Sequence, residues 1–368
     1  MAEQKKLAFV DALRGIAVLA VVLSHSPLPA SASRLTTMGA HGVQLFFVVS
    51  AFTLFLSMEA KYHTEHRPNL NFFVRRFFRI APTFYFAAMF YLLKDGWDVS
   101  FWAPDGIHVL QIASTLLFLH GWHPGTINAI VPGGWSIAVE MTFYLFVPLC
   151  FTFIRSVRTA LFTSFILLVA GVVLGRLLQP QLAAAYGPDH IELVNYFIQL
   201  WFPSQACVFP LGFALFYLFR NHVAQSRDAP GAAVLISLSA YLCLAFSSGG
   251  YALLPSHFMY GLAFVLLGYA LAVHPFKFLV NPVMCHIGKV SFSVYLFHFW
   301  ALDLVKDHVG PLITSINPYA ASVIFYACAT FVAVGLATLA YLGIEKPGQM
   351  IGRRLIERLE ARTTIQSA

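Results

Sequence analysis

Long apolar runs recur along the whole chain, separated by short segments that carry most of its charged side chains. A helix needs about 20 predominantly apolar residues to cross the hydrocarbon core of a bilayer. The runs predict ten such helices, near residues 8–26, 40–58, 80–95, 135–154, 159–178, 193–219, 230–247, 256–273, 289–305 and 319–344. The pattern therefore predicts an all-α integral membrane protein, a polytopic bundle of about ten transmembrane helices.

An eleventh apolar segment, residues 107–120, is too short to span the bilayer comfortably. If it does not cross and the N-terminus is cytoplasmic, 18 of the 23 Lys and Arg residues fall on the inner side. A full crossing would move every later loop to the other side and destroy this bias. We therefore expect a re-entrant or interfacial segment, both termini cytoplasmic, and residence in the inner (cytoplasmic) membrane.

The two ends of the chain have distinct patterns. Glu345-Lys346-Pro347 predicts the end of the last helix, and the basic, amphipathic stretch IGRRLIERLEAR follows it. We expect a membrane domain over 1–348 and a cytoplasmic tail over 349–368 that lies on the inner leaflet.

At the N-terminal end, Lys5 and Lys6 before an apolar run, with SPLPASAS after it, also fit a cleavable signal peptide. Asp11 and Arg14 disfavour that alternative, because they lie so close to the apolar core.

Composition agrees with the membrane assignment. The chain is 59% apolar and 11% charged, with a mean hydropathy of +0.73, whereas soluble domains carry about 25% charged residues. The net charge of +7 follows from basic loops and is no sign of nucleic-acid binding. The five cysteines are widely separated, without the spacing of a metal site or a disulfide framework. We expect no metal and no tightly bound cofactor.

Ionisable residues on the first predicted helix form a stripe. Arg14 and His25 are 11 residues apart, close to three full turns, so their side chains share one face. Asp11 lies three residues before Arg14, on the same face and within pairing reach. Exposure to lipid would be costly, so this face must point to the bundle interior or a water-filled cavity. The alternative is a structural ion pair and a histidine at the outer interface.

Two further ionisable residues lie in predicted spans. Glu140 shares a helix face with Ser136 and Tyr144, and Ser136 is placed to cap the start of that helix. His298 lies within the aromatic stretch SFSVYLFHFW. For both residues the alternative is structural: a carboxylate held by neighbouring hydroxyls, and a histidine packed among aromatic rings.

A basic cluster, RRFFR at residues 75–79, precedes the third predicted helix. It either anchors the topology or binds phosphate groups at the membrane surface, because arginine contacts phosphate in a bidentate manner.

Six stretches in order resemble the signatures of the membrane-bound acyltransferase-3 family. They are FVDALRGIAVLAVVLSH, GVQLFFVVSAF, RRFFRIAP, GGWSIAVEMTFYLF, IGKVSFSVYLFHFW and YLGIEKP. Together they extend from about residue 7 to residue 347. The departures are Ala51 where Gly is usual, Gln44 where Asp is common and Met141 where a second Glu is frequent.

The resemblance implies transfer of an acyl group, usually acetyl, from acyl-CoA as co-substrate to a hydroxyl of a carbohydrate or lipid-linked glycan. His25 then serves as general base or transient acyl carrier, and Arg14 contacts the donor. Glu140 either orients His25 or accepts a hydrogen bond from the hydroxyl of the carbohydrate. Arg76 and Arg79 take the nucleotide phosphates. The remaining residues expected at the substrate sites are Asp11, Trp135, Ser136, Tyr144 and His298.

Two other classes of protein fit some of these residues. Intramembrane Arg, His and Glu also mark proton-coupled transporters, although the inverted repeats typical of transporters are not visible in this sequence. In a membrane scaffold the same side chains would only fix helix packing. The sequence leaves open the identity of the acceptor and the length of the acyl group.

Overall fold

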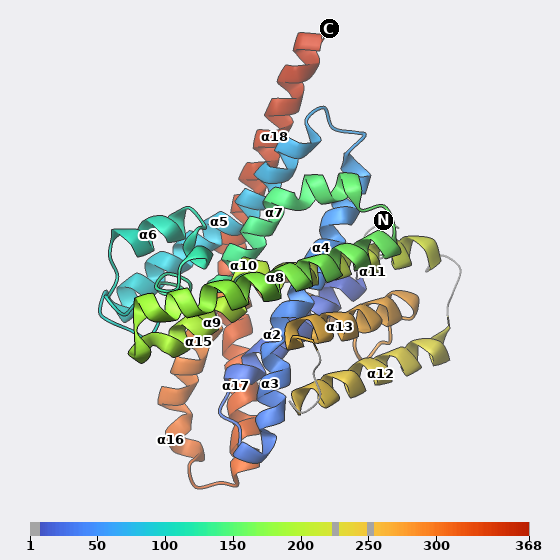
Figure 1. Cartoon of the computed structure of the whole chain (residues 1–368). Helices are drawn as coiled ribbons and strands as arrows, with labels where there is room; N and C mark the ends of the chain where they lie inside the picture. Colours follow the sequence, from blue (N-terminus) through green and yellow to red (C-terminus); the bar gives the residue numbers. More distant parts are fainter. Residues whose placement is uncertain (1–7, 223–227, 249–253, 368) are drawn as a thin grey trace. The chain divides into compact units, whose positions relative to one another are not determined.

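The computed structural model describes residues 8–222, 228–248 and 254–367. Apart from an isolated bridge between Ser100 and Ala103, these residues form helices, turns and irregular segments (Figure 1). Eight helical stretches among them are long and apolar enough to cross a membrane: Ala8–His25, Ala30–Lys61, Trp135–Phe153, Val157–Tyr186, Phe202–Asn221, Ala229–Ser247, Ser256–Val273 and Pro318–Ala361. The all-α polytopic prediction is confirmed, and the number of spans stays a prediction.

The chain divides into two compact units. The first contains residues 1–52, 156–161 and 208–339. Its helices are α2 (Ala8–His25), α3 (Ser33–Ala40), the first part of α4 (Gly42–Lys61), α11 (Phe209–His222), α12 (Ala229–Ser247), α13 (Ser256–Val273), α14 (Pro282–Lys289), α15 (Ser291–His308), α16 (Gly310–Ile313) and nearly all of α17 (Pro318–Ala340). Helices α12 and α13 run side by side (Figure 1). Of the basic residues expected on the inner side, Lys5, Lys6 and Arg227 lie outside the described residues.

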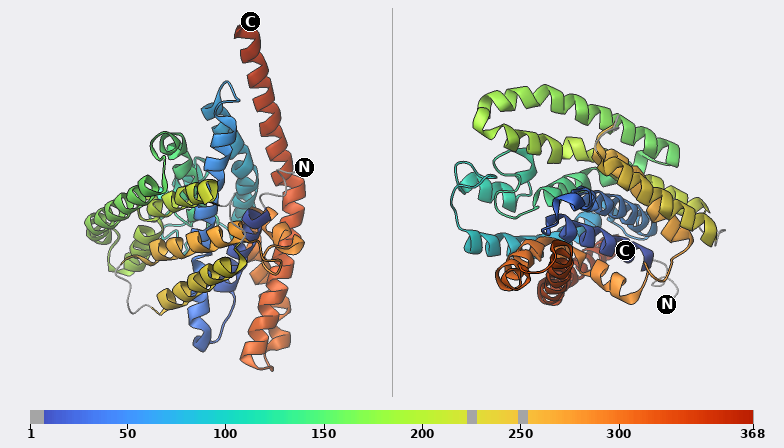
Figure 2. Two further views of the ribbon diagram at one scale, coloured as in Figure 1. Left: turned by 90° about the vertical axis from the view of Figure 1, so that its right-hand side faces the viewer. Right: turned by 90° about the horizontal axis from the view of Figure 1, so that it is seen from below.

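The second unit contains residues 53–155, 162–207 and 340–368. Its helices are α5 (Pro68–Asp95), α6 (Val109–Leu116), α7 (Trp135–Phe153), most of α8 (Val157–Tyr186), α9 (Ile191–Leu200), α10 (Phe202–Gln205) and α18 (Lys346–Ser367). The chain turns back after α8 at Gly187, which has a φ of 78°, so that α9 returns along α8 (Figure 2).

Three of the predicted spans differ from the observed helices. The helix predicted over 193–219 is broken: α9 ends at Leu200, Trp201 is extended, and α10 begins at Phe202. Pro203 explains the break, because proline has no N–H to continue the helix and its ring would clash with the carbonyl four residues earlier. The span predicted over 80–95 lies within α5, and all but the first two residues of the span predicted over 289–305 lie within α15. Neither helix is among the eight apolar stretches.

The segment 107–120 contains only the eight-residue helix α6. Its length of about 12 Å is less than half the thickness of the hydrocarbon core, in agreement with a segment that does not cross. Phe118 follows with a φ of 59°, a left-handed conformation that is rare outside glycine. Its ring packs against Phe84 and Tyr85 of α5, and these contacts stabilise the turn.

The helix end predicted at Glu345-Lys346-Pro347 is wrong. A π-helical turn, Tyr341–Glu345, connects α17 to α18 without a break. The wider hydrogen-bond pattern of a π turn accommodates Pro347, which lacks an N–H. The start of α18 packs on α5, where a Cβ on Gly348 would lie 2.7 Å from Pro82. The position of the tail on the inner leaflet stays a prediction.

Helix α2 owes its position to close backbone contacts with α14. A Cβ on Gly15 would lie 2.6 Å from the carbonyl oxygen of Met284, and a Cβ on Gly288 would overlap the carbonyl of Asp11. Small residues permit this approach, which is the usual packing mode of helices in membranes. The contacts fix the rotation of α2 and therefore the direction in which Arg14 and His25 point.

We predict that Gly288→Ala destabilises the protein, because the new methyl group would meet backbone that cannot move away. Overpacking of this kind costs about 1–3 kcal/mol. The matched control is Gly335→Ala in α17, where no atom lies within 4 Å of the new Cβ. Thermal unfolding in detergent should show a lower Tm for Gly288→Ala and an unchanged or higher Tm for the control. An unchanged Tm for Gly288→Ala would contradict the close α2–α14 contact.

Candidate functional site

His25 and His298 lie side by side in the first unit. His25 is the last residue of α2 and is exposed, while His298 of α15 is completely buried. Their ring centroids are 5.3 Å apart, and the Phe299 ring lies 4.6 Å from His25 and 4.2 Å from His298. His25, which was expected to be catalytic, and His298, which was expected at a substrate site, therefore meet where α2 ends.

The helix face that carries Asp11, Arg14 and His25 extends from His25 toward the start of α2. Val18 and Val22, which lie between Arg14 and His25 on this face, are fully buried, and Arg14 and Asp11 are half-buried. The buried valines confirm that the middle of this helix face points into the protein. Arg14 lies about 16 Å below His25 along the axis. The pairing of Asp11 with Arg14 stays a prediction.

A second group of polar residues lies in the other unit, where α5 and α7 pack together. The Tyr144 hydroxyl donates a hydrogen bond of 2.6 Å to Glu140 Oε1, as the shared helix face predicted. Arg76 of α5 is close enough to interact electrostatically with both residues, and Arg79 of α5 with Tyr144. The structure therefore brings Arg76, Arg79, Glu140 and Tyr144 together. The role of Glu140 toward His25 stays a prediction.

The arginines of RRFFR have different surroundings. Arg75 donates a hydrogen bond of 2.7 Å to Glu65, which compensates its charge locally. Arg76 lies over the Phe72 ring at 5.6 Å. The Nε atoms of Arg75 and Arg76 are both buried without a hydrogen-bond partner among the described residues, but only the Arg75 charge is paired with Glu65. Arg76 is thus better suited than Arg75 to meet an anionic ligand.

The start of α7 is held by a residue that the sequence analysis missed. Asn128 Oδ1 accepts a hydrogen bond of 3.2 Å from the N–H of Trp135, the first residue of α7. Ser136 does not cap the helix as expected, because it lies inside the first turn and donates to the Gly133 carbonyl instead. Trp135 and Ser136 are both buried, and their contact with a substrate stays a prediction.

His120 supports the same helix start from the segment before α7. Its Nε2 donates a hydrogen bond of 2.9 Å to the Gly134 carbonyl, and its ring stacks on Phe84 at 5.4 Å. Because His120 is almost completely buried, desolvation lowers its pKa to about 4. The ring is therefore neutral at pH 7.

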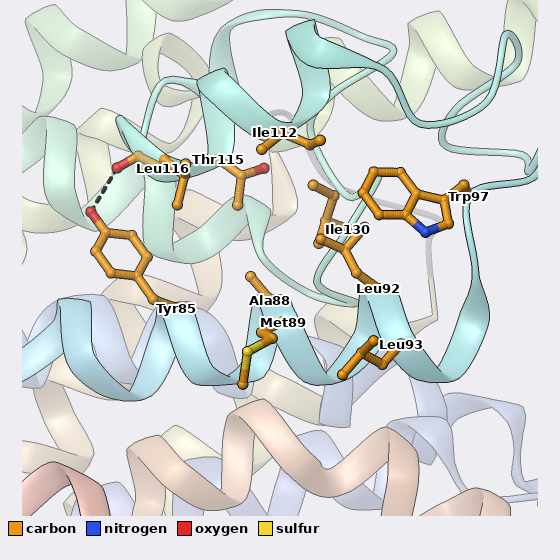
Figure 3. Close-up of a pocket in the computed structure, with 10 residues that line it drawn as sticks. All are labelled: Tyr85, Ala88, Met89, Leu92, Leu93, Trp97, Ile112, Thr115, Leu116 and Ile130. Atoms are coloured by element: carbon orange, nitrogen blue, oxygen red, sulfur yellow. Dashed lines mark hydrogen bonds between the residues drawn. The ribbon is translucent and has the colours of Figure 1, made fainter.

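A pocket of about 230 Å³ opens between α5 and the α6 segment (Figure 3). The Tyr85 hydroxyl donates to the Leu116 carbonyl at 2.6 Å, so this polar group is already paired. Most of the wall is apolar and fits hydrocarbon better than a charged group; it consists of Tyr85, Ala88, Met89, Leu92, Leu93, Trp97, Ile112, Thr115, Leu116 and Ile130.

We predict that His120 makes the stability of the protein depend on pH. Between pH 6.5 and about 4, the unfolded state binds a proton at this residue and the folded state does not. The free energy of unfolding should therefore decrease by up to about 3 kcal/mol as the pH falls through this window. His120→Gln keeps an N–H for the Gly134 carbonyl but does not titrate. Its Tm should fall less steeply between pH 7 and pH 4; equal slopes for both proteins would contradict the prediction.

Comparisons with known proteins agree with the order of motifs along the chain. The acyltransferase-3 family model, described as an acyltransferase domain, matches residues 7–342. The relatives named O-acetyltransferase OatA from Staphylococcus aureus strains NCTC 8325 / PS 47, COL and MRSA252 are each 24% identical over 383 residues. The match covers 94% of this chain and 58% of each relative, so the chain spans little more than half their length. No solved structure matches the chain. The family match over nearly the whole chain shows that this protein belongs to the acyltransferase-3 family of membrane-bound acyltransferases.

Proposed function

We propose that this protein transfers an acetyl group from acetyl-CoA to a hydroxyl of a surface or exported carbohydrate. The observation that carries the proposal is the face of α2 with Arg14 and His25, within a chain that the acyltransferase family matches over residues 7–342. The relatives named O-acetyltransferase support acetyl as the transferred group and oxygen as the accepting atom.

His25 is the proposed catalytic residue. Acyl transfer to a hydroxyl needs a group that takes the hydroxyl proton, and histidine is the common base near neutral pH. His25 is exposed at the end of α2, where a substrate can reach it. It either removes this proton directly or carries the acyl group for a short time as a nucleophile.

Arginines are proposed to bind the acyl donor. Arg76 is the best candidate for a CoA phosphate, because the charge of Arg75 is already paired with Glu65 and Arg79 lies beside Arg76. Arg14, deeper along α2, is proposed to contact the thioester carbonyl or a further phosphate. These roles require the start of α5 on the cytoplasmic side, where acyl-CoA is available, and are consistent with both termini there in the inner membrane.

The acceptor is proposed to be a glycan. Glu140 is the proposed partner of a sugar hydroxyl, because an ionised carboxylate accepts hydrogen bonds and Tyr144 holds this one in place. The pocket between α5 and α6 favours a lipid-linked form of the glycan, because its apolar wall suits a hydrocarbon chain (Figure 3). Membrane lipids offer similar chains and would compete for this pocket.

We predict that His25→Ala abolishes acetylation. Loss of a general acid–base residue typically reduces the rate about 10²–10⁴-fold, and loss of a covalent carrier removes the pathway entirely. The measurement is mass spectrometry of surface and exported glycans from cells with the intact gene, a deletion or His25→Ala. Alkali-labile acetyl groups should be present only with the intact gene.

The control is His308→Ala, which removes an exposed histidine at the end of α15. Each variant is checked for membrane insertion by fluorescence-detected size-exclusion chromatography. Acetylation that persists in His25→Ala would move the catalytic role to another residue. No acyl difference between intact and deletion cells would contradict a glycan acceptor, and flux of a substrate without ester formation would favour a transporter.

A further inference from the structure

The packing of α15 does not explain why a polar nitrogen of His298 is buried without a hydrogen bond. The side chain is completely buried, yet its Nε2 has no hydrogen-bond partner among the described residues. Buried polar atoms in proteins are almost always paired, and the exceptions commonly have a functional reason. A phenylalanine would fill the same space without leaving a polar atom unpaired.

The other ring nitrogen fixes the protonation state of His298. Nδ1 lies 2.6 Å from the carbonyl oxygen of Tyr295. A carbonyl can only accept a hydrogen bond, so Nδ1 carries the proton. In the neutral ring Nε2 then has a free lone pair and acts as an acceptor. The backbone of α15 thus presents His298 as a hydrogen-bond acceptor in a buried position.

His25 is an ionisable side chain of another helix that lies close to this ring. The two ring centroids are 5.3 Å apart, with planes inclined by 41°. Two imidazoles joined by one N–H···N hydrogen bond have centroids about 5 Å apart. The observed separation matches this value, and the second side-chain torsion of histidine has broad minima that let the His25 ring turn.

We propose that His298 is a positioning residue for His25. Its Nε2 accepts a hydrogen bond from one ring nitrogen of His25 and so leaves the other nitrogen of His25 unprotonated. This inference rests on the proposed acyl transfer, in which His25 is the base, and adds His298 as the group that sets the tautomer of His25. His298 is buried behind an exposed His25, an arrangement that places it out of reach of the substrate but in contact with the base.

The proton balance of the reaction is then complete. The free nitrogen of His25 takes the proton of the acceptor hydroxyl while the oxygen forms a bond to the thioester carbon. The C–S bond breaks, and His25 returns the proton to the thiolate of CoA. His298 keeps its own proton on Nδ1 throughout and stabilises the imidazolium of His25 through Nε2.

Two substitutions separate the roles of the two nitrogens. His298→Asn places an amide near Nδ1 and leaves nothing at the position of Nε2, whereas His298→Gln places an amide oxygen near Nε2. We expect kcat to fall about 10–100-fold in His298→Asn, a magnitude typical of lost orienting partners. His298→Gln should retain most of the rate. KM for acetyl-CoA should stay the same in both variants, because His298 does not contact the donor.

The matched control is His308→Asn on the same helix. His308 Nδ1 also contacts a backbone carbonyl, that of Leu304 at 2.9 Å, but its side chain is exposed. This variant should keep the kcat of the wild-type protein. Rates are measured as release of CoA thiol by purified protein in proteoliposomes, with membranes of the deletion strain as the source of the unacetylated acceptor glycan.

A double-mutant cycle tests whether His298 acts through His25. If it does, His298→Asn should not reduce further the residual rate of His25→Ala. Equal loss in the Asn and Gln variants, an additive loss in the cycle, or failure of both variants to fold would assign His298 a packing role and overturn the inference. A wild-type protein that releases no CoA in the presence of acceptor would instead contradict the proposed function.

Discussion

The structure depends on one constraint: ionisable side chains at membrane depth must be held by protein, because lipid cannot solvate them. Helix α2 carries three of them, and it meets the constraint through close packing rather than through apolar side chains alone. Gly15 and Gly288 bring the backbones of α2 and α14 together, which fixes the rotation of α2. Arg14 then lies against protein, and His25 reaches the surface beside His298.

The polar residues fall into two groups that divide the expected chemistry. The group on α2 and α15 holds histidines, which transfer protons near neutral pH. The group on α5 and α7 holds Arg76 and Arg79, with Glu140 bonded to Tyr144, and its arginines suit the phosphates of an acyl donor. Both groups are positioned by buried contacts of their neighbours, such as the Asn128 bond to the start of α7.

Features that depend on local geometry were predictable from the sequence. The alignment of Arg14 with His25 and the bond between Tyr144 and Glu140 follow from helical periodicity. Features that depend on tertiary contacts were not. The proximity of His298 to His25 joins residues far apart in the chain, and Asn128 caps a helix that begins seven residues later. The continuation of the last helix past Pro347 needs a π turn, which has no simple sequence signature.

The most direct test of acyl transfer by this protein is a stoichiometric assay with the purified chain in proteoliposomes. Acetyl-CoA labelled in the acetyl group is supplied together with a lipid-linked or free glycan acceptor. Acyl transfer through His25 predicts that each labelled ester on the glycan accompanies one molecule of free CoA, and that His25→Ala lowers the rate of both about 10²–10⁴-fold. Movement of the glycan across the bilayer without ester formation or CoA release would contradict it.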